Sequence, residues 1–232
     1  MAYELFYWPS IQGRGEFVRL ALEEAGQDYV DVARGPGGVE AMMAAMKEDP
    51  RPSFAPPFLH SAEVRIGQTA AILLYLGERH GLAPQDLPGR LWTHQLQLTI
   101  ADLVGEAHDT HHPVGSSLYY EDQQDEARRR AADFTAARIP KFLDYFSRVL
   151  GEQDYLLGDQ LTYADLSLFQ VLEGLRYAFP NAAREVLAKH ANLDGLRRRV
   201  AERPRIKAYL ASKRRLPFNE DGIFRHYPEL DA

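Results

Sequence analysis

The chain has 232 residues, of which 45% are hydrophobic and 26% charged, with a formal net charge of −6 and no cysteine. This composition excludes disordered and fibrous classes, and the negative balance argues against nucleic-acid binding as the main role. The lack of cysteine excludes disulfides, thiolate metal sites and a protein thiol as nucleophile. No run of 18 apolar residues and no signal-peptide pattern is visible, so we expect a cytoplasmic protein that does not contact a membrane.

The first 81 residues alternate strand-like and helix-like segments. Apolar and aromatic runs predict strands at residues 3–7, 29–33, 58–60 and 64–66, the last two forming a hairpin. Helical spacing covers residues 17–25, 39–47 and 68–80. Gly26 and Gly81 stand where C-terminal helix caps belong. The order β-α-β-α-β-β-α predicts a four-stranded mixed sheet with helices on its faces.

The second part of the chain is helical almost throughout. Residues 82–89 form a polar, proline-containing connector between a domain at 1–81 and a domain at 90–232. The periodicity then predicts helices at 90–112, 123–150, 162–179, about 183–190, 193–202 and 204–212. Pro140 should kink or break the second of these helices. The aromatic tail over residues 216–228 is expected to dock on the two domains.

The opening segment carries a family resemblance. Residues 3–9 read Tyr-Glu-Leu-Phe-Tyr-Trp-Pro, and residues 13–16 read Gly-Arg-Gly-Glu. This segment resembles the start of the tyrosine-type cytosolic glutathione transferases (sigma, pi, mu and alpha), in a bacterial-looking member. The resemblance spans nearly the whole chain. It implies an α/β plus all-α fold, in which a thioredoxin-like glutathione-binding domain precedes an all-helical domain.

By this resemblance, Tyr7 supplies the hydroxyl that faces the glutathione sulfur. A phenol that donates a hydrogen bond to a thiolate stabilises the charged form and lowers the pKa of the thiol. The loop at Ser10 is one residue longer than is usual in those classes, and Ser10 fits the position of the serine that other classes use. A third interpretation is that Tyr7 is only a buried strand aromatic with a satisfied hydroxyl.

A second segment, Gln68-Thr69, is similar to the Gln-Ser/Thr motif that opens the third helix of the family. The motif implies binding of the γ-glutamyl carboxylate and amine, and a helix N-terminus suits an anion. Lys47 has the family spacing for the glycyl carboxylate. Arg14 either positions the first loop and adds positive charge near the thiolate, or is only salt-bridged. Asp102 either reaches the γ-glutamyl amine across a dimer interface, or is an exposed helix acid.

The family also places a cis-proline before its third strand. The residue that precedes this proline offers a backbone N–H and C=O to the cysteinyl unit. If Pro57 is cis, the preceding residue is Pro56, which has no N–H to donate. If Pro56 is cis, Ala55 supplies both groups and Lys47 falls at the usual distance upstream. We therefore expect Pro56 to be the cis-proline.

Two further motifs lie in the helical part. Thr162 and Asp165 form a capping box, which resembles the structural motif of the family's helical domain. His108 and His112 are four residues apart, a spacing found in zinc sites. No third ligand can be assigned, so we expect no metal.

The resemblance instead places this helix end beside the cleft. A pocket for a hydrophobic or aromatic electrophile would then be lined by His108, His112, Tyr119 and Tyr120. The alternative is that this helix end is solvated or lies in an interface.

These features together indicate a glutathione transferase that conjugates glutathione, its co-substrate, to a small electrophile. The resemblance also implies a homodimer. Two alternatives stay open: a glutathione-dependent peroxidase or isomerase that uses the same thiolate, and a non-catalytic glutathione transferase-like binding or scaffold protein.

Overall fold

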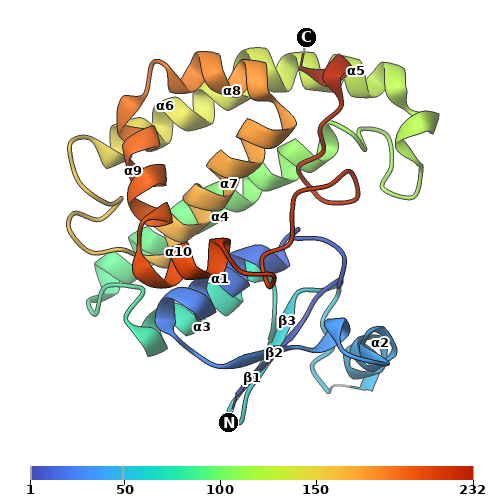
Figure 1. Cartoon of the computed structure of the whole chain (residues 1–232), viewed down its shortest axis with the longest axis vertical. Helices are drawn as coiled ribbons and strands as arrows, with labels where there is room; N and C mark the ends of the chain where they lie inside the picture. Colours follow the sequence, from blue (N-terminus) through green and yellow to red (C-terminus); the bar gives the residue numbers. More distant parts are fainter. Residues whose placement is uncertain (1, 49, 232) are drawn as a thin grey trace.

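The computed structural model describes residues 2–48 and 50–231. A small sheet with α2 lies at one end of the molecule, and the later helices form a bundle at the other end (Figure 1). The strands are β1 (Tyr3–Phe6), β2 (Tyr29–Asp31), β3 (Phe58–His60) and β4 (Arg65–Gly67). The helices are α1 (Gly15–Ala25), α2 (Gly38–Glu48), α3 (Thr69–His80), α4 (Leu87–Asp109), α5 (Gln124–Asp133), α6 (Ile139–Leu150), α7 (Tyr163–Ala178), α8 (Pro180–Leu187), α9 (Ala191–Ala201) and α10 (Pro204–Leu210).

The sheet has the strand order β2-β1-β3-β4, with β1 parallel to β2 and the other neighbours antiparallel. Successive side chains of β1 point to opposite faces. Leu5 joins the main core with α1 and α3, whereas Phe6 packs with Met42 of α2 in a second cluster. The predicted mixed sheet covered by helices is therefore confirmed.

The second strand is shorter than predicted. β2 ends at Asp31, and residues Val32–Arg34 form a 3₁₀ turn. The Asp31 carboxylate accepts a hydrogen bond from Arg19 Nε at 2.7 Å and pairs with Arg34 at 3.0 Å. These side-chain contacts accompany the turn of the backbone away from the sheet after Asp31.

Helix α4 is displaced toward the N-terminus relative to its prediction. It begins at Leu87, where Asp86 caps it by accepting a hydrogen bond from the Gly89 N–H at 2.8 Å. The predicted connector 82–89 therefore shortens to 82–86. The helix ends at Asp109, before His112, and the Thr110 hydroxyl donates to the Ala107 carbonyl at 2.7 Å.

The predicted disturbance of the helix at Pro140 is confirmed, as a π-helical turn between α5 and α6. α5 ends at Asp133, residues Phe134–Arg138 form a π-helical turn, and α6 starts at Ile139 with the proline in its first turn. Proline lacks the N–H that a continuous helix would need, so it is tolerated at a helix start. In the described part of the chain, no helix is long and apolar enough to cross a membrane.

The predicted capping box at the start of α7 is also confirmed. The Asp165 carboxylate accepts hydrogen bonds from the Thr162 N–H and the Leu156 N–H, each at 2.8 Å, and from the Thr162 hydroxyl at 2.7 Å. Asp165 is fully buried, and this burial raises the pKa of its carboxyl to about 6. The box therefore joins the loop at Leu156 to the helix that runs through the centre of the bundle.

Asp165→Ala should cost about 3 kcal/mol of unfolding free energy, because two buried N–H groups lose their acceptor. Asp86→Ala is a matched control, since it removes an exposed cap and should cost only about 1 kcal/mol. Urea unfolding of the two variants measures the difference. Equal losses would contradict a special role for the buried box.

Candidate functional site

Tyr7 directly follows β1, and its side chain lies against the turn that leads into α1. Gly13 and Gly15 make this approach possible. A Cβ atom added at Gly13 would lie 2.0 Å from the Tyr7 hydroxyl oxygen, and one at Gly15 would lie 2.6 Å from the ring. Gly13 also has a φ of +45°, which favours glycine. The two glycines therefore let the loop close over the phenol.

The Tyr7 hydroxyl accepts a hydrogen bond from the Arg14 N–H at 2.8 Å. Burial raises the pKa of Tyr7, while this hydrogen bond and the positive charges of Arg14 and Arg19 act in the opposite direction. The Arg19 guanidinium lies 5.8 Å from the centre of the Tyr7 ring. The accepted hydrogen bond leaves the phenolic proton available, so Tyr7 can donate it to an anionic atom.

Ser10 lies in the loop after Tyr7 and is exposed. Its carbonyl accepts a hydrogen bond from Asn219 Nδ2 at 3.0 Å, which ties this loop to the C-terminal tail.

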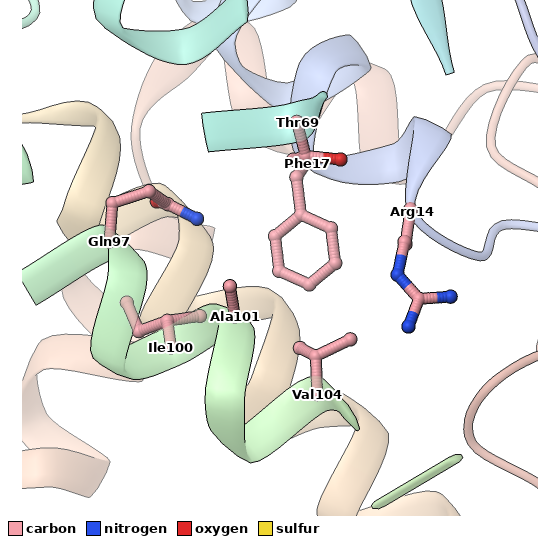
Figure 2. Close-up of a pocket in the computed structure, with 7 residues that line it drawn as sticks. All are labelled: Arg14, Phe17, Thr69, Gln97, Ile100, Ala101 and Val104. Atoms are coloured by element: carbon pink, nitrogen blue, oxygen red, sulfur yellow. The ribbon is translucent and has the colours of Figure 1, made fainter. Parts of the chain in front are cut away.

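A small, half-open cavity lies between the first domain and α4, and Arg14 connects it to Tyr7. Side chains from the start of α1, the start of α3 and one face of α4 point toward this common space (Figure 2). The lining residues are Arg14, Phe17, Thr69, Gln97, Ile100, Ala101 and Val104. The structure thus brings two predicted residues, Arg14 and Thr69, to one site.

Gln97 lines the same cavity and was not anticipated. A signal was present in the sequence, because Gln97 stands among Leu96, Ile100 and Val104 on the helical stripe that faces the core. A buried glutamine at such a position needs partners for its amide. Its place beside Thr69 depends on the packing of α4 against α3, which local patterns do not reveal.

The other predicted glutathione contacts lie on the surface. Gln68 is the N-cap residue of α3 with a φ of +67°, and its side chain is exposed. Lys47 is exposed in the last turn of α2. Asp102 is exposed on α4 and does not line the cavity, although its neighbour Ala101 does.

The prediction for the cis-proline was wrong. The cis peptide bond joins Pro56 to Pro57, so Pro57 is the cis residue, directly before β3 begins at Phe58. Pro56, and not Ala55, therefore precedes the cis bond. Because proline has no N–H, the backbone at Pro56 can offer only its carbonyl to a ligand.

Three histidines gather where α4 ends. The ring centres of His108, His111 and His112 lie between 4.7 and 5.2 Å from one another. Burial lowers the pKa of all three, the positive charge of Arg225 adds to the effect, and the pKa of His111 falls to about 3. The buried His111 donates from Nε2 to the Ile223 carbonyl at 2.9 Å. Within residues 2–48 and 50–231, no set of three His, Asp or Glu side chains could hold a metal ion.

The two tyrosines predicted beside these histidines have other surroundings. Tyr119 is 78% exposed. Tyr120 is buried, stacks on Tyr227 with ring centres 3.9 Å apart, and donates to Glu229 at 2.8 Å. Neither residue lines the cavity of Figure 2. Tyr120 therefore holds the C-terminal tail.

The expected docking of the tail is confirmed. The tail runs from α10 back across the molecule and ends near α5 (Figure 1). Phe224 lies over Gly174 of α7, where a Cβ atom would approach the ring to 2.3 Å. At the end of the tail, the Asp231 carboxylate accepts hydrogen bonds from the N–H groups of Asn181 and Ala182 at 2.7 and 3.0 Å, which caps α8.

Comparison with known proteins identifies relatives over nearly the full chain. Residues 108–213 match the family model described as "Glutathione S-transferase, C-terminal domain". The chain is 28% identical to "Glutathione S-transferase Mu 6" of Mus musculus, covering 94% of both, and 27% identical to "Glutathione S-transferase P" of Bos taurus, covering 95% and 98%. The fold matches a Pi-class glutathione S-transferase of Onchocerca volvulus with a TM-score of 0.74 at 21% identity, covering 96% of this chain and 99% of that one.

The histidine cluster predicts a pH-dependent stability. The folded protein keeps His111 neutral down to about pH 3, whereas the unfolded chain protonates it near pH 6.5. The contribution of neutral His111 to the free energy of unfolding is therefore fully present above pH 6.5, and it is lost as the pH falls toward 3. Between pH 7 and pH 5, wild type should lose about 2 kcal/mol more than His111→Gln.

Urea unfolding at the two pH values measures this difference. Tyr120→Phe is the control, because it weakens the tail without removing a group that titrates in this range. Parallel losses in wild type and His111→Gln would contradict the prediction.

Proposed function

We propose that this chain, which is similar to glutathione S-transferases over nearly its full length, conjugates glutathione to a small electrophile. The observation that carries the proposal is the Tyr7 hydroxyl, which accepts a hydrogen bond from the Arg14 N–H beside the cavity. This phenol can donate its own proton toward a sulfur atom. A hydrogen bond to the thiolate stabilises the charged form and lowers the pKa of the thiol.

In the proposed reaction, the glutathione thiol releases its proton to solvent and its sulfur stays hydrogen-bonded to Tyr7. The sulfur electron pair attacks an electrophilic carbon. A C–S bond forms while the bond to the leaving group, such as a halide, breaks and the halide departs with its electron pair. The protein supplies position and charge stabilisation, so it needs no nucleophile of its own.

The remaining contacts to glutathione follow from the family resemblance and the observed placement. Arg14, Gln68 and Thr69 would hold the γ-glutamyl end at the start of α3. Lys47 would meet the glycyl carboxylate. The Pro56 carbonyl would accept a hydrogen bond from the cysteinyl N–H, in the role first given to Ala55.

For the electrophile, we propose a wall formed by His108 and His112 at the end of α4. His108 follows the cavity-lining Val104 by four residues and so shares its face of α4.

Tyr7→Phe should lower conjugation of an aryl halide about 10- to 100-fold, because it removes a hydrogen bond to a charged atom. The affinity for glutathione should stay nearly unchanged, because the phenol contacts only the sulfur. Steady-state kinetics and calorimetric titration measure the two quantities. Ser10→Ala is the matched control and should retain activity; the opposite pattern would assign the role to Ser10.

We further propose that the protein is a homodimer. Phe54 is 95% exposed in the loop before β3, and Leu91 and Leu98 of α4 are 61% and 47% exposed. Leu91, Leu98 and Asp102 follow helical spacing and share one face of α4. Large apolar side chains exposed together favour a protein interface.

Phe54→Ala should weaken this dimer at least about 10-fold, since a large aromatic side chain buried in an interface contributes 2 kcal/mol or more. Light scattering during size-exclusion chromatography at several concentrations measures the change. Val30→Ala is the control, because Val30 is also exposed but lies on the edge strand β2. A variant Phe54→Ala that stays as dimeric as wild type would contradict the proposed interface.

A further inference from the structure

Gln12 lies in the loop between Tyr7 and α1, and its side chain is buried, with only 4% exposed. Its Nε2 donates to the Leu216 carbonyl, 204 positions away, at 2.5 Å, and its Oε1 accepts from Gln170 Nε2, 158 positions away, at 2.7 Å. A buried amide whose donor and acceptor are both satisfied is held in one orientation. The side chain of Gln12 therefore attaches this loop to α7 and to the start of the C-terminal tail.

The partners of Gln12 are themselves held by an arginine. Gln170 is 1% exposed, and its Oε1 accepts a hydrogen bond from Arg215 Nη2 at 3.0 Å. Arg215 directly precedes Leu216 and also forms an ion pair with Glu16 of α1. The hydrogen bonds and the backbone thus close a ring, whose members are Gln12, Gln170, Arg215 and Leu216. A buried polar network with its partners in place is rigid.

The main chain of Gln12 leads directly to the phenol. Its carbonyl accepts hydrogen bonds from the Glu16 N–H at 3.0 Å and from Arg19 Nη1 at 3.3 Å. Two residues after Gln12, the Arg14 N–H donates to the Tyr7 hydroxyl at 2.8 Å. Because each peptide unit is planar, a shift of Gln12 is passed on to the Arg14 N–H.

The hydrogen bond from Arg14 affects what the phenol can donate. Burial raises the pKa of Tyr7, whereas this hydrogen bond and the positive charges of Arg14 and Arg19 act to lower it. Successive hydrogen bonds polarise one another, so a hydroxyl that accepts a hydrogen bond is a stronger donor. The position of the loop therefore sets how strongly Tyr7 donates to a bound anion.

We propose that Gln12 is a positioning residue: through its buried amide, α7 and the start of the tail hold the loop where the Arg14 N–H donates to Tyr7. This inference rests on the proposed function, in which Tyr7 donates to the glutathione sulfur. Gln12 does not line the cavity of Figure 2, so its effect on the thiolate passes through Tyr7.

The test replaces Gln12 by methionine, which has nearly the same volume and makes neither hydrogen bond. Titration of the ultraviolet absorption of the thiolate against pH, with glutathione bound, gives the pKa of the thiol. Gln12→Met should raise this pKa by about 0.5 to 1, which is half the effect of losing a hydrogen bond to a charged group. At a pH below this pKa, calorimetric titration should give the wild-type affinity for glutathione.

Two comparisons separate positioning from a general structural effect. In the Tyr7→Phe background, Gln12→Met should leave the pKa of the bound thiol unchanged, because the group through which Gln12 acts is gone. Gln160→Met is the matched control, since Gln160 also joins the two parts of the chain, by donating to the Gly81 carbonyl at 3.4 Å, but on the surface. This control should keep the wild-type pKa of the thiol.

Gln170→Met is the second variant, should Gln12→Met not fold. It removes one of the two hydrogen bonds of the Gln12 amide, so it should raise the pKa of the bound thiol by a smaller amount. The comparison in the Tyr7→Phe background is then made with this variant.

A wild-type pKa of the thiol in Gln12→Met overturns the proposal, as does a wild-type pKa in Gln170→Met when Gln12→Met does not fold. An equal shift with and without the Tyr7 hydroxyl also overturns it, as does a shift of the same size in Gln160→Met. In these cases the proposed function stands, provided that Tyr7→Phe raises the pKa of the bound thiol. A wild-type protein that does not bind glutathione, or a Tyr7→Phe variant with an unchanged pKa, overturns the proposed function and this inference together.

Discussion

The structure depends on one buried ion pair, formed by Glu16 and Arg19 on α1. Both side chains are completely buried, and their charged atoms lie 3.1 Å apart. Arg19 also donates to Asp31 at 2.7 Å, and Glu16 accepts from the Tyr209 hydroxyl at 2.7 Å and from Arg215. Buried charges are tolerated only when they are paired and hydrogen-bonded, and loss of one partner is strongly destabilising. This network therefore joins α1 to the end of β2 and to the C-terminal segment.

The same network holds the loop that covers Tyr7. Arg19 donates to the Gln12 carbonyl at 3.3 Å, and the Gln12 side chain donates to the Leu216 carbonyl at 2.5 Å and accepts from Gln170 at 2.7 Å. The loop after Gln12 then presents the Arg14 N–H to the Tyr7 hydroxyl. The Arg19 guanidinium therefore has two effects on Tyr7. It fixes the loop that covers the phenol, and it places a positive charge beside the aromatic ring.

Both parts of the chain contribute residues to the candidate site. The first part provides the phenol, the Arg14 N–H and the start of α3, whereas α4 supplies the apolar wall and Gln97. The C-terminal tail fixes both parts through Ser10, His111 and the start of α8. A ligand in the cavity therefore contacts elements from both parts at once, and the tail stabilises the arrangement without lining the cavity of Figure 2.

The sequence alone determined what depends on neighbours along the chain. Gly26 and Gly81 adopt the left-handed conformation of helix caps, the Thr162–Asp165 box forms, and α6 starts at Ile139 with Pro140 in its first turn. Each follows from backbone geometry or hydrogen bonds within a few residues, as does the position of Tyr7 after the first strand. Only the tertiary structure decided the cis bond at Pro57, the approach of Gln97 to Thr69 and the stacking of Tyr120 on Tyr227. The last two join residues from about 30 to more than 100 positions apart. The sequence also offers two adjacent X-Pro bonds, at Pro56 and at Pro57, and local patterns do not select which of them is cis.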